Sequence, residues 1–403
     1  MKACNGGVCA PAGFRAAGVH CGIRKNKSKK DLALIYSDTP CAAAAVYTQN
    51  LVKGAPITVT RENIADGRAQ AVLCNSGNAN TCNADGPAVA RRMCELAASA
   101  CGLDPRDVIV ASTGVIGQRL DISPIEASIG ALKDALSETG SRDAAEAIMT
   151  TDTARKEVAV AFTVGGVECR LGGIAKGSGM IHPNMATMLL FMTTDAKVAP
   201  AALQKALSTV VPATFNQISV DGDTSTNDTV LLLASGLSGA EVQPGTADYD
   251  TFVAALTQVA EQLSRELAGD GEGATKLLEC IVTGAPDLLT ARAVSKSVIH
   301  STLFKAAMFG ADANWGRVLC AIGYSGAAVD VEKIDVSFRS VKGQVDVCRN
   351  GAGIEFSEEK ASEVLGEKEI TILVSLHMGG ESAEAYGCDL TYDYVKINGD
   401  YRT

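Results

Sequence analysis

The chain has 403 residues, of which 47% are hydrophobic and 20% are charged. This length exceeds what one hydrophobic core usually supports, so we expect two or three structural units. The formal net charge of −10 argues against nucleic acid or an anionic membrane as a partner, because both call for basic patches. Small charged metabolites fit this composition better.

Apolar or alternating runs typical of strands follow one another along the chain and arrive in clusters. They lie at 32–37, 43–48, 71–74, 108–111, 158–164, 167–174, 188–192, 229–234 and 370–377. Helical periodicity is clearest at 87–100, 125–137, 200–210, 249–267 and 291–307. Clusters of strands between helices predict an α/β (α+β) fold, a layered helix-sheet-sheet-helix sandwich with a smaller C-terminal α/β domain.

Glycine and proline gather at 242–247 and 283–288, and such clusters mark loops between units. We therefore expect a main sandwich domain at 1–199, an α/β domain at 200–285 and a C-terminal α/β domain at 286–403. The acidic stretch at 355–369 is most simply a solvated helix or loop face.

Cysteine and histidine show no metal-site pattern. Thirteen cysteines are scattered from Cys4 to Cys388 without the two-residue spacing of a zinc or redox motif, which predicts reduced, buried thiols and no metal. The N-terminus resembles neither a signal peptide nor a presequence, and no apolar run approaches the ~20 residues of a membrane helix. A cytoplasmic protein without a membrane partner is expected.

The most informative segment runs from Lys176 to Met192, where a glycine-rich polar loop passes directly into an apolar run. Thr187 stands at this junction. A threonine hydroxyl is a weak nucleophile, and an α-amine on the same residue can activate it as a base. An internal threonine gains that amine only if the peptide bond before it breaks, most simply by attack of its own hydroxyl on the carbonyl of Ala186. By composition alone, Thr187 would more often be an edge residue of a buried strand.

Further polar motifs are spread from end to end of the chain. They are GGV at 6–8, APAGFRAAG at 10–18, NSGNAN at 75–80, STGVIG at 112–117, MTTDT at 149–153, SVDGDTSTNDT at 219–229, GDGEGATK at 269–276, NWGR at 314–317 and NGDYRT at 398–403. Together with the 176–192 segment, this collinear set resembles the ornithine acetyltransferases, often bifunctional glutamate N-acetyltransferases of arginine biosynthesis. Such coverage is far more specific than any one motif.

The resemblance implies an acyl-transfer centre. Thr187 is then the nucleophile of self-cleavage after Ala186 and the acceptor of the acetyl group. Thr113 and the backbone N–H of Gly114 are the expected donors to the oxyanion, in a turn that otherwise reads as a structural corner.

The same resemblance implies the substrate contacts. Lys176, otherwise a surface loop lysine, holds a carboxylate or favours deprotonation of the Thr187 amine. Glu272 lies among glycines in a loop that lacks the ending of a phosphate-binding motif, and its charge attracts the ammonium of ornithine. Thr150 belongs to this substrate set. So do Asn398 and Thr403, which follow a strand-like run at 390–397, although position alone makes the C-terminus a frayed tail.

The implied reaction moves acetyl from N-acetylornithine to Thr187 and then to glutamate, without a cofactor. Acetyl-CoA is a second candidate donor if the enzyme is bifunctional. The implied assembly contains two α pieces (1–186) and two β pieces (187–403).

Two alternatives stay open. A related self-processing N-terminal-nucleophile aminopeptidase or amidohydrolase would pass the acyl group to water. A non-catalytic binding protein would keep the ligand residues and remain uncut.

Overall fold

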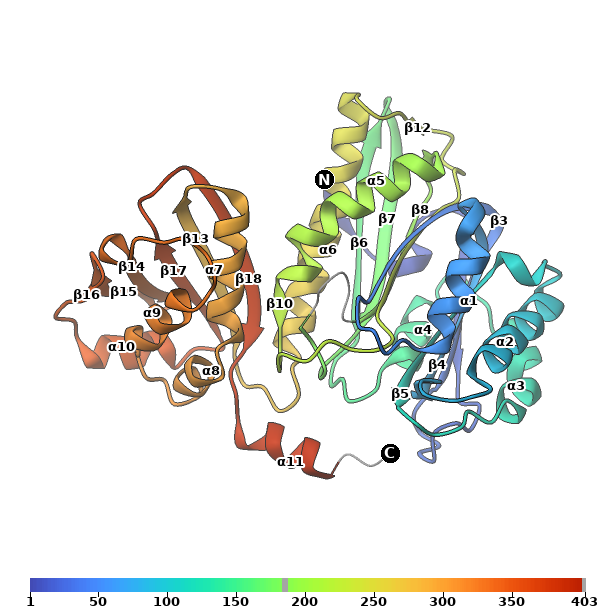
Figure 1. Cartoon of the computed structure of the whole chain (residues 1–403). Helices are drawn as coiled ribbons and strands as arrows, with labels where there is room; N and C mark the ends of the chain where they lie inside the picture. The colour runs from blue at the N-terminus through green and yellow to red at the C-terminus, as the bar shows by residue number, and fades with distance from the viewer. Residues whose placement is uncertain (183–187, 401–403) are drawn as a thin grey trace.

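The computed structural model describes residues 1–182 and 188–400. A nine-stranded sheet organises the larger part of the chain (Figure 1). Its strands run in the order β1-β6-β7-β8-β11-β3-β4-β5, and β2 pairs with β3 outside this path. The bounds are β1 Lys2–Cys4, β2 Phe14–Val19, β3 Leu32–Tyr47, β4 Arg68–Asn78, β5 Val108–Val115, β6 Lys156–Val164, β7 Val167–Lys176, β8 Leu189–Thr194 and β11 Thr229–Ala234.

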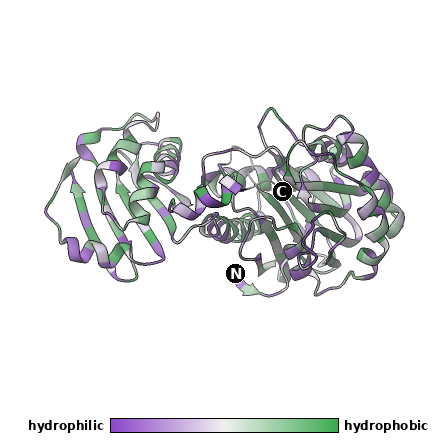
Figure 2. Ribbon diagram, turned by 90° about the horizontal axis from the view of Figure 1, so that it is seen from below, coloured by the Kyte–Doolittle hydropathy of each residue, from purple (hydrophilic) through white to green (hydrophobic). Residues whose placement is uncertain are grey.

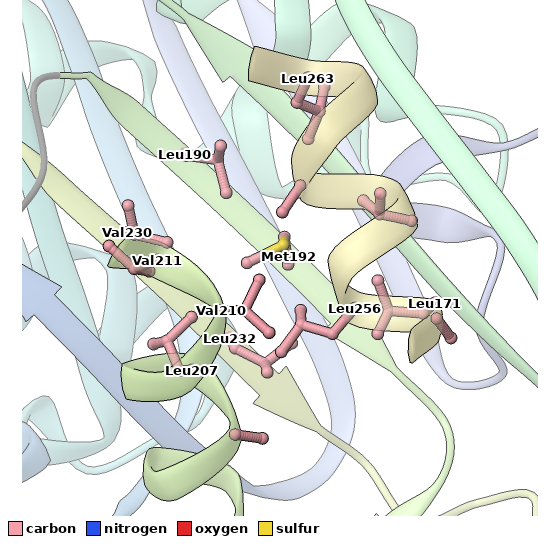
Figure 3. Packing of buried hydrophobic residues seen from close by; sticks show 14 of the residues in the cluster. Leu171, Leu190, Met192, Leu207, Val210, Val211, Val230, Leu232, Leu256 and Leu263 are labelled. Carbon is pink, nitrogen blue, oxygen red and sulfur yellow. The ribbon is translucent and has the colours of Figure 1, made fainter. Parts of the chain in front are cut away.

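Both faces of this sheet are buried under helices. Along β8, Leu190 and Met192 join the core beneath α5 and α6, whereas Leu189 and Phe191 join the core beneath α4. This alternation follows from the two-residue period of a strand. Figure 3 shows the first of these cores, where side chains of α5 and α6 meet Leu190 and Met192. The helices of this part are α1 Ala55–Asn63, α2 Gly86–Cys101, α3 Ser123–Asp134, α4 Ser141–Ile148, α5 Pro200–Val210 and α6 Ala247–Gly269.

A second, seven-stranded sheet has the order β10-β18-β13-β17-β14-β15-β16. Seen from below, it lies beside the larger part of the chain, and its strands carry both hydrophobic and hydrophilic residues (Figure 2). Its strands are β10 Ile218–Ser219, β13 Leu277–Ala285, β14 Asp335–Ser340, β15 Gly343–Arg349, β16 Ala352–Gly353, β17 Glu369–Ser375 and β18 Glu381–Cys388. Its helices are α7 Leu288–His300, α8 Thr302–Phe309, α9 Trp315–Gly323 and α10 Glu358–Leu365. A small pair, β9 Lys197–Val198 and β12 Glu241–Val242, and the C-terminal helix α11 Tyr392–Asp400 complete these elements.

The expected α/β class and its layering of sheets and helices are confirmed. The strand expected at 229–234 and the helix expected at 200–210 have these bounds in β11 and α5. The runs at 32–37 and 43–48 are one long strand, β3. The helix expected at 291–307 is divided into α7 and α8 by Ser301, whose hydroxyl caps α8 by accepting a hydrogen bond from the N–H of Phe304.

The C-terminal approach is corrected. A strand was expected at 390–397, but the chain forms the helix α11 there. The three-domain division stays a prediction. Strands from 1–199 and 200–285 share the large sheet, and strands from 200–285 and 286–403 share the second one.

The thirteen cysteines are all unpaired, and most are at least partly buried. The expectation of general burial is wrong for Cys82 and Cys320, which are exposed. No helix in the described ranges has the length and apolar character needed to cross a membrane.

Candidate active site

One cavity of about 140 Å³ gathers six side chains or backbone positions that the sequence singled out. They reach it from β5, from the loop after α4, from the end of β7, from the loop after α6 and from α11. The six residues are Thr113, Gly114, Thr150, Lys176, Glu272 and Asn398. The other three, Ala186, Thr187 and Thr403, lie outside the described residues.

Thr113 and Gly114 stand at the end of β5, where the strand opens into the cavity. Gly114 has φ of +131°, and a Cβ there would overlap the backbone of Gly77 on the neighbouring strand β4. Only glycine combines this conformation with so close an approach. The corner at Thr113 and Gly114 is therefore built by tight pairing of two strand ends.

Lys176 ends β7, and its side chain points to the same corner. Its Nζ lies 3.4 Å from the Oγ1 of Thr113, to which it donates a hydrogen bond. The residue is 8% exposed and ends a strand, so the alternative of a surface loop lysine is wrong. A buried ammonium needs compensating charge or hydrogen bonds.

The buried charge of Lys176 is compensated by a network of buried charges that the sequence did not predict. The Nζ of Lys156 lies 2.8 Å from a carboxylate oxygen of Asp152 and 2.6 Å from one of Asp270. Asp152 also accepts hydrogen bonds from the N–H of Gly177 and of Thr150, at 2.6 and 2.9 Å. Burial alone would raise the pKa of Asp152, but the ammonium groups of Lys156 and Lys176 outweigh it and hold that pKa below its usual value.

Glu272 adds a negative charge to the lining of the cavity. It is 7% exposed, and its Oε2 accepts a 2.7 Å hydrogen bond from the Nδ2 of Asn398. A side chain at Gly179 would overlap the Glu272 carboxylate, so this glycine makes room for it. The helix α11 thereby brings the C-terminal Asn398 to a site whose other residues come from far earlier in the chain.

The 225–227 segment, part of the SVDGDTSTNDT motif, forms a further wall of the cavity. Asn227 is 6% exposed and ties three segments together. Its Nδ2 donates to the carbonyl oxygens of Ala79 and Ser112, at 2.5 and 2.9 Å, and its Oδ1 accepts from the hydroxyl of Thr81 at 2.6 Å. Its place in the SVDGDTSTNDT motif was the available signal.

Asp228 follows directly and is buried without an ion pair among the described residues. Its Oδ2 has no hydrogen-bond partner in that part of the chain, and burial raises its pKa well above the usual value. The next residue, Thr229, donates its N–H to the carbonyl oxygen of Met188 at 2.9 Å. Asp228 therefore lies beside the start of β8. This strand begins shortly after Thr187, the residue expected to be the nucleophile.

The described ranges contain no cluster of three or more histidine, cysteine or acidic side chains that could hold a metal ion. The polar groups of the cavity instead suit an amino acid. They offer an ammonium from Lys176, a carboxylate from Glu272 and neutral hydrogen-bonding groups between them.

Comparison with known proteins places this chain in a family. The model of the ArgJ family matches residues 15–403. The chain is 53% identical to the arginine biosynthesis bifunctional protein ArgJ of Symbiobacterium thermophilum over 99% of both chains. It is 48% identical to the protein of the same name from Bacillus subtilis, over 99% of this chain and 97% of the relative. A crystal structure of the ArgJ bifunctional protein from Bacillus halodurans is 46% identical, with a TM-score of 0.50, and the match covers 52% of this chain and 98% of that one. The chain belongs to the ArgJ family.

Proposed function

We propose that this enzyme transfers acetyl from N-acetylornithine to glutamate through an acetyl ester on Thr187. The observation that carries the proposal is the cavity itself, which is lined by Lys176, hydrogen-bonded to Thr113, and by Glu272, hydrogen-bonded to Asn398. Membership of the ArgJ family makes the chain an arginine-biosynthesis acyltransferase. The donor, the acetyl-Thr187 intermediate and the residue roles are those that the sequence resemblance implies.

Self-cleavage would come first. The Oγ1 of Thr187 attacks the carbonyl carbon of Ala186, the C–N bond breaks, and the chain continues through an ester. Water then hydrolyses this ester, which leaves a carboxylate on residue 186 and a free α-amine on Thr187. The similar Bacillus halodurans chain is about half as long as this one, which is compatible with a cut near the middle.

Acetyl transfer would use the amine that cleavage creates. The amine accepts the proton of the Thr187 hydroxyl as that oxygen attacks the acetyl carbonyl of N-acetylornithine. Thr113 and the N–H of Gly114 stabilise the oxyanion, and ornithine leaves with the proton. The amino group of glutamate then attacks the acetyl ester and releases Thr187.

Substrate placement follows from charge. Glu272 would pair with the side-chain ammonium of ornithine, and Lys176 would either hold a carboxylate or lower the pKa of the Thr187 amine by its positive charge. Thr150, Asn398 and Thr403 complete the amino-acid contacts. No cofactor is required, acetyl-CoA is a second candidate donor, and an assembly of two α and two β pieces in the cytoplasm is part of the same proposal.

The kinetic test separates this reaction from hydrolysis. Incubation with N-acetylornithine alone should add one acetyl group to the piece that begins at Thr187, and added glutamate should remove it as N-acetylglutamate. Double-reciprocal plots for the two substrates should give parallel lines. Acetate released at the same rate without glutamate would instead identify the aminopeptidase-like alternative.

A further inference from the structure

A second cavity, of about 590 Å³, lies between α7 and the short helical turns Val211–Ala213 and Phe215–Gln217. Four basic side chains line it, and we name it the basic cleft: His182, Arg292, Lys296 and His300. The last three are spaced four residues apart on α7, so they share one face of that helix. None of the described residues that line the cleft is acidic.

The two histidines of the basic cleft are held against each other. Their ring centroids lie 4.5 Å apart, and Ser219 lies between them. The Ser219 hydroxyl is 3.0 Å from the Nδ1 of His182 and 3.5 Å from the Nδ1 of His300. Both rings therefore line the same cleft as Arg292 and Lys296.

Burial lowers the pKa of three of the basic groups in the cleft. Burial lowers the pKa of Lys296 to about 8. Burial, followed by the nearby charges of Lys296 and His300, lowers the pKa of His182 to about 3. Burial and the ammonium groups of Lys305 and Lys296 also lower the pKa of His300, against an opposite effect of Asp221 and Asp223. An anion bound in the cleft would favour the charged forms of these groups and raise their pKa values.

The basic cleft adjoins the candidate active site. Thr224 lines the cleft and the next residue, Ser225, lines the smaller cavity. Successive Cα atoms are about 3.8 Å apart, so one strip of backbone separates the two sites. The hydroxyl of Thr224 also donates a 2.8 Å hydrogen bond to the carbonyl oxygen of His182, which joins this strip to the cleft wall.

We propose that the basic cleft binds the phosphate groups of a phosphorylated ligand. Arg292 offers a planar guanidinium that can hold two phosphate oxygens at once, and Lys296 adds a compact positive charge one helical turn away. Two sources share this chemistry, namely a coenzyme A thioester that delivers acetyl to the adjoining site and free inorganic phosphate. The assignment to an acetyl donor rests on the proposed function, whereas the anion site does not.

Calorimetric titration of the purified protein with coenzyme A, pantetheine and inorganic phosphate tests the cleft directly. Coenzyme A should bind and pantetheine, which lacks phosphate, should not. Arg292→Gln and Lys296→Gln should each weaken coenzyme A binding about tenfold, the loss of one charge-assisted hydrogen bond. Lys205→Gln, which removes an exposed lysine of α5, should leave the affinity unchanged.

The outcomes separate the two ligand sources. Tighter binding of coenzyme A than of phosphate, together with a raised KM for acetyl-CoA but not for N-acetylornithine in Arg292→Gln, identifies the acetyl donor. Equal binding of both ligands, weakened by the same substitutions, identifies a phosphate site alone. Absent binding in the wild type, or affinities that both substitutions leave unchanged, would overturn the proposal. Because binding is measured without turnover, a failure of the acetyl-transfer proposal would be seen separately. Arg292→Gln remains informative if Lys296→Gln does not fold.

Discussion

The Nζ of Lys176 donates a hydrogen bond of 3.4 Å to the Oγ1 of Thr113, joining the end of β7 to the end of β5. These residues are 63 positions apart in the chain, and the large sheet brings them together. The contact orients the Thr113 hydroxyl, because an oxygen that accepts from an ammonium can direct its own proton elsewhere. A Thr113 hydroxyl proton directed into the cavity would stabilise an oxyanion there.

Thr113→Val should therefore lower kcat for acetyl transfer by about 10²-fold or more, the usual loss when an oxyanion donor is removed. The change keeps the shape of the side chain and removes its hydroxyl. Steady-state kinetics with N-acetylornithine and glutamate measure the effect. Thr163→Val, at an exposed position of β6, is the matched control and should keep the wild-type rate. An unchanged kcat in Thr113→Val would remove this residue from the reaction.

Glu272→Gln should raise the KM for N-acetylornithine about tenfold, because a charged partner of the substrate ammonium becomes neutral. The amide can still bond to Asn398, whose Nδ2 lies 2.7 Å from the Glu272 carboxylate, so the fold should persist. Glu359→Gln on the exposed surface of α10 serves as the control. Equal KM values in wild type and Glu272→Gln would make this glutamate a purely structural residue.

Lys156→Met should destabilise the protein by about 3–5 kcal/mol, since it leaves the buried carboxylates of Asp152 and Asp270 without their shared cation. Urea denaturation measures the free energy of unfolding, and a Thr187→Ala background keeps the chain in one piece for this purpose. Lys205→Met on the surface of α5 should change stability by no more than about 0.5 kcal/mol. If Lys156→Met lost no more stability than Lys205→Met does, the charge network would contribute little.

Asp228→Asn should increase stability at neutral pH. Burial raises the pKa of Asp228, so the folded protein holds this proton more tightly than the unfolded chain does. The wild type consequently loses stability as the pH rises from the usual aspartate pKa towards the raised one, by about 1.4 kcal/mol for each unit between them. Asparagine removes this loss. Denaturation at several pH values, again in the uncleaved background, should give a difference that grows between pH 4 and pH 7. A constant difference would contradict the account.

The sequence predicted the helices and strands whose type is determined by their own residues. The helix at 200–210 and the strand at 229–234 have unbroken apolar patterns, and the structure confirms both. The strand prediction at 390–397 failed because the pattern there also fits a short helix. Long-range contacts of α11, such as that of Asn398 with Glu272, cannot be seen in the sequence. The cap at Ser301 likewise depends on a turn that periodicity does not reveal.

The candidate site divides in the same way. Its motifs could be recognised because each is a local run of unusual polar residues and glycines. The network of Lys156 could not, because Asp270 is 114 residues away and only the folded sheet brings the two together. The burial of Asp228 could not be predicted either, because it lies in a run of polar residues.

The most direct test of the central claim, that Thr187 is a nucleophile made by self-cleavage, is an intact-mass measurement of the purified protein with N-terminal sequencing. The account predicts two pieces, the second beginning Thr-Met-Leu-Leu, and a single whole, inactive chain for Thr187→Ala. An uncut wild-type chain that transfers acetyl, or a Thr187→Ala protein that does so, would contradict it.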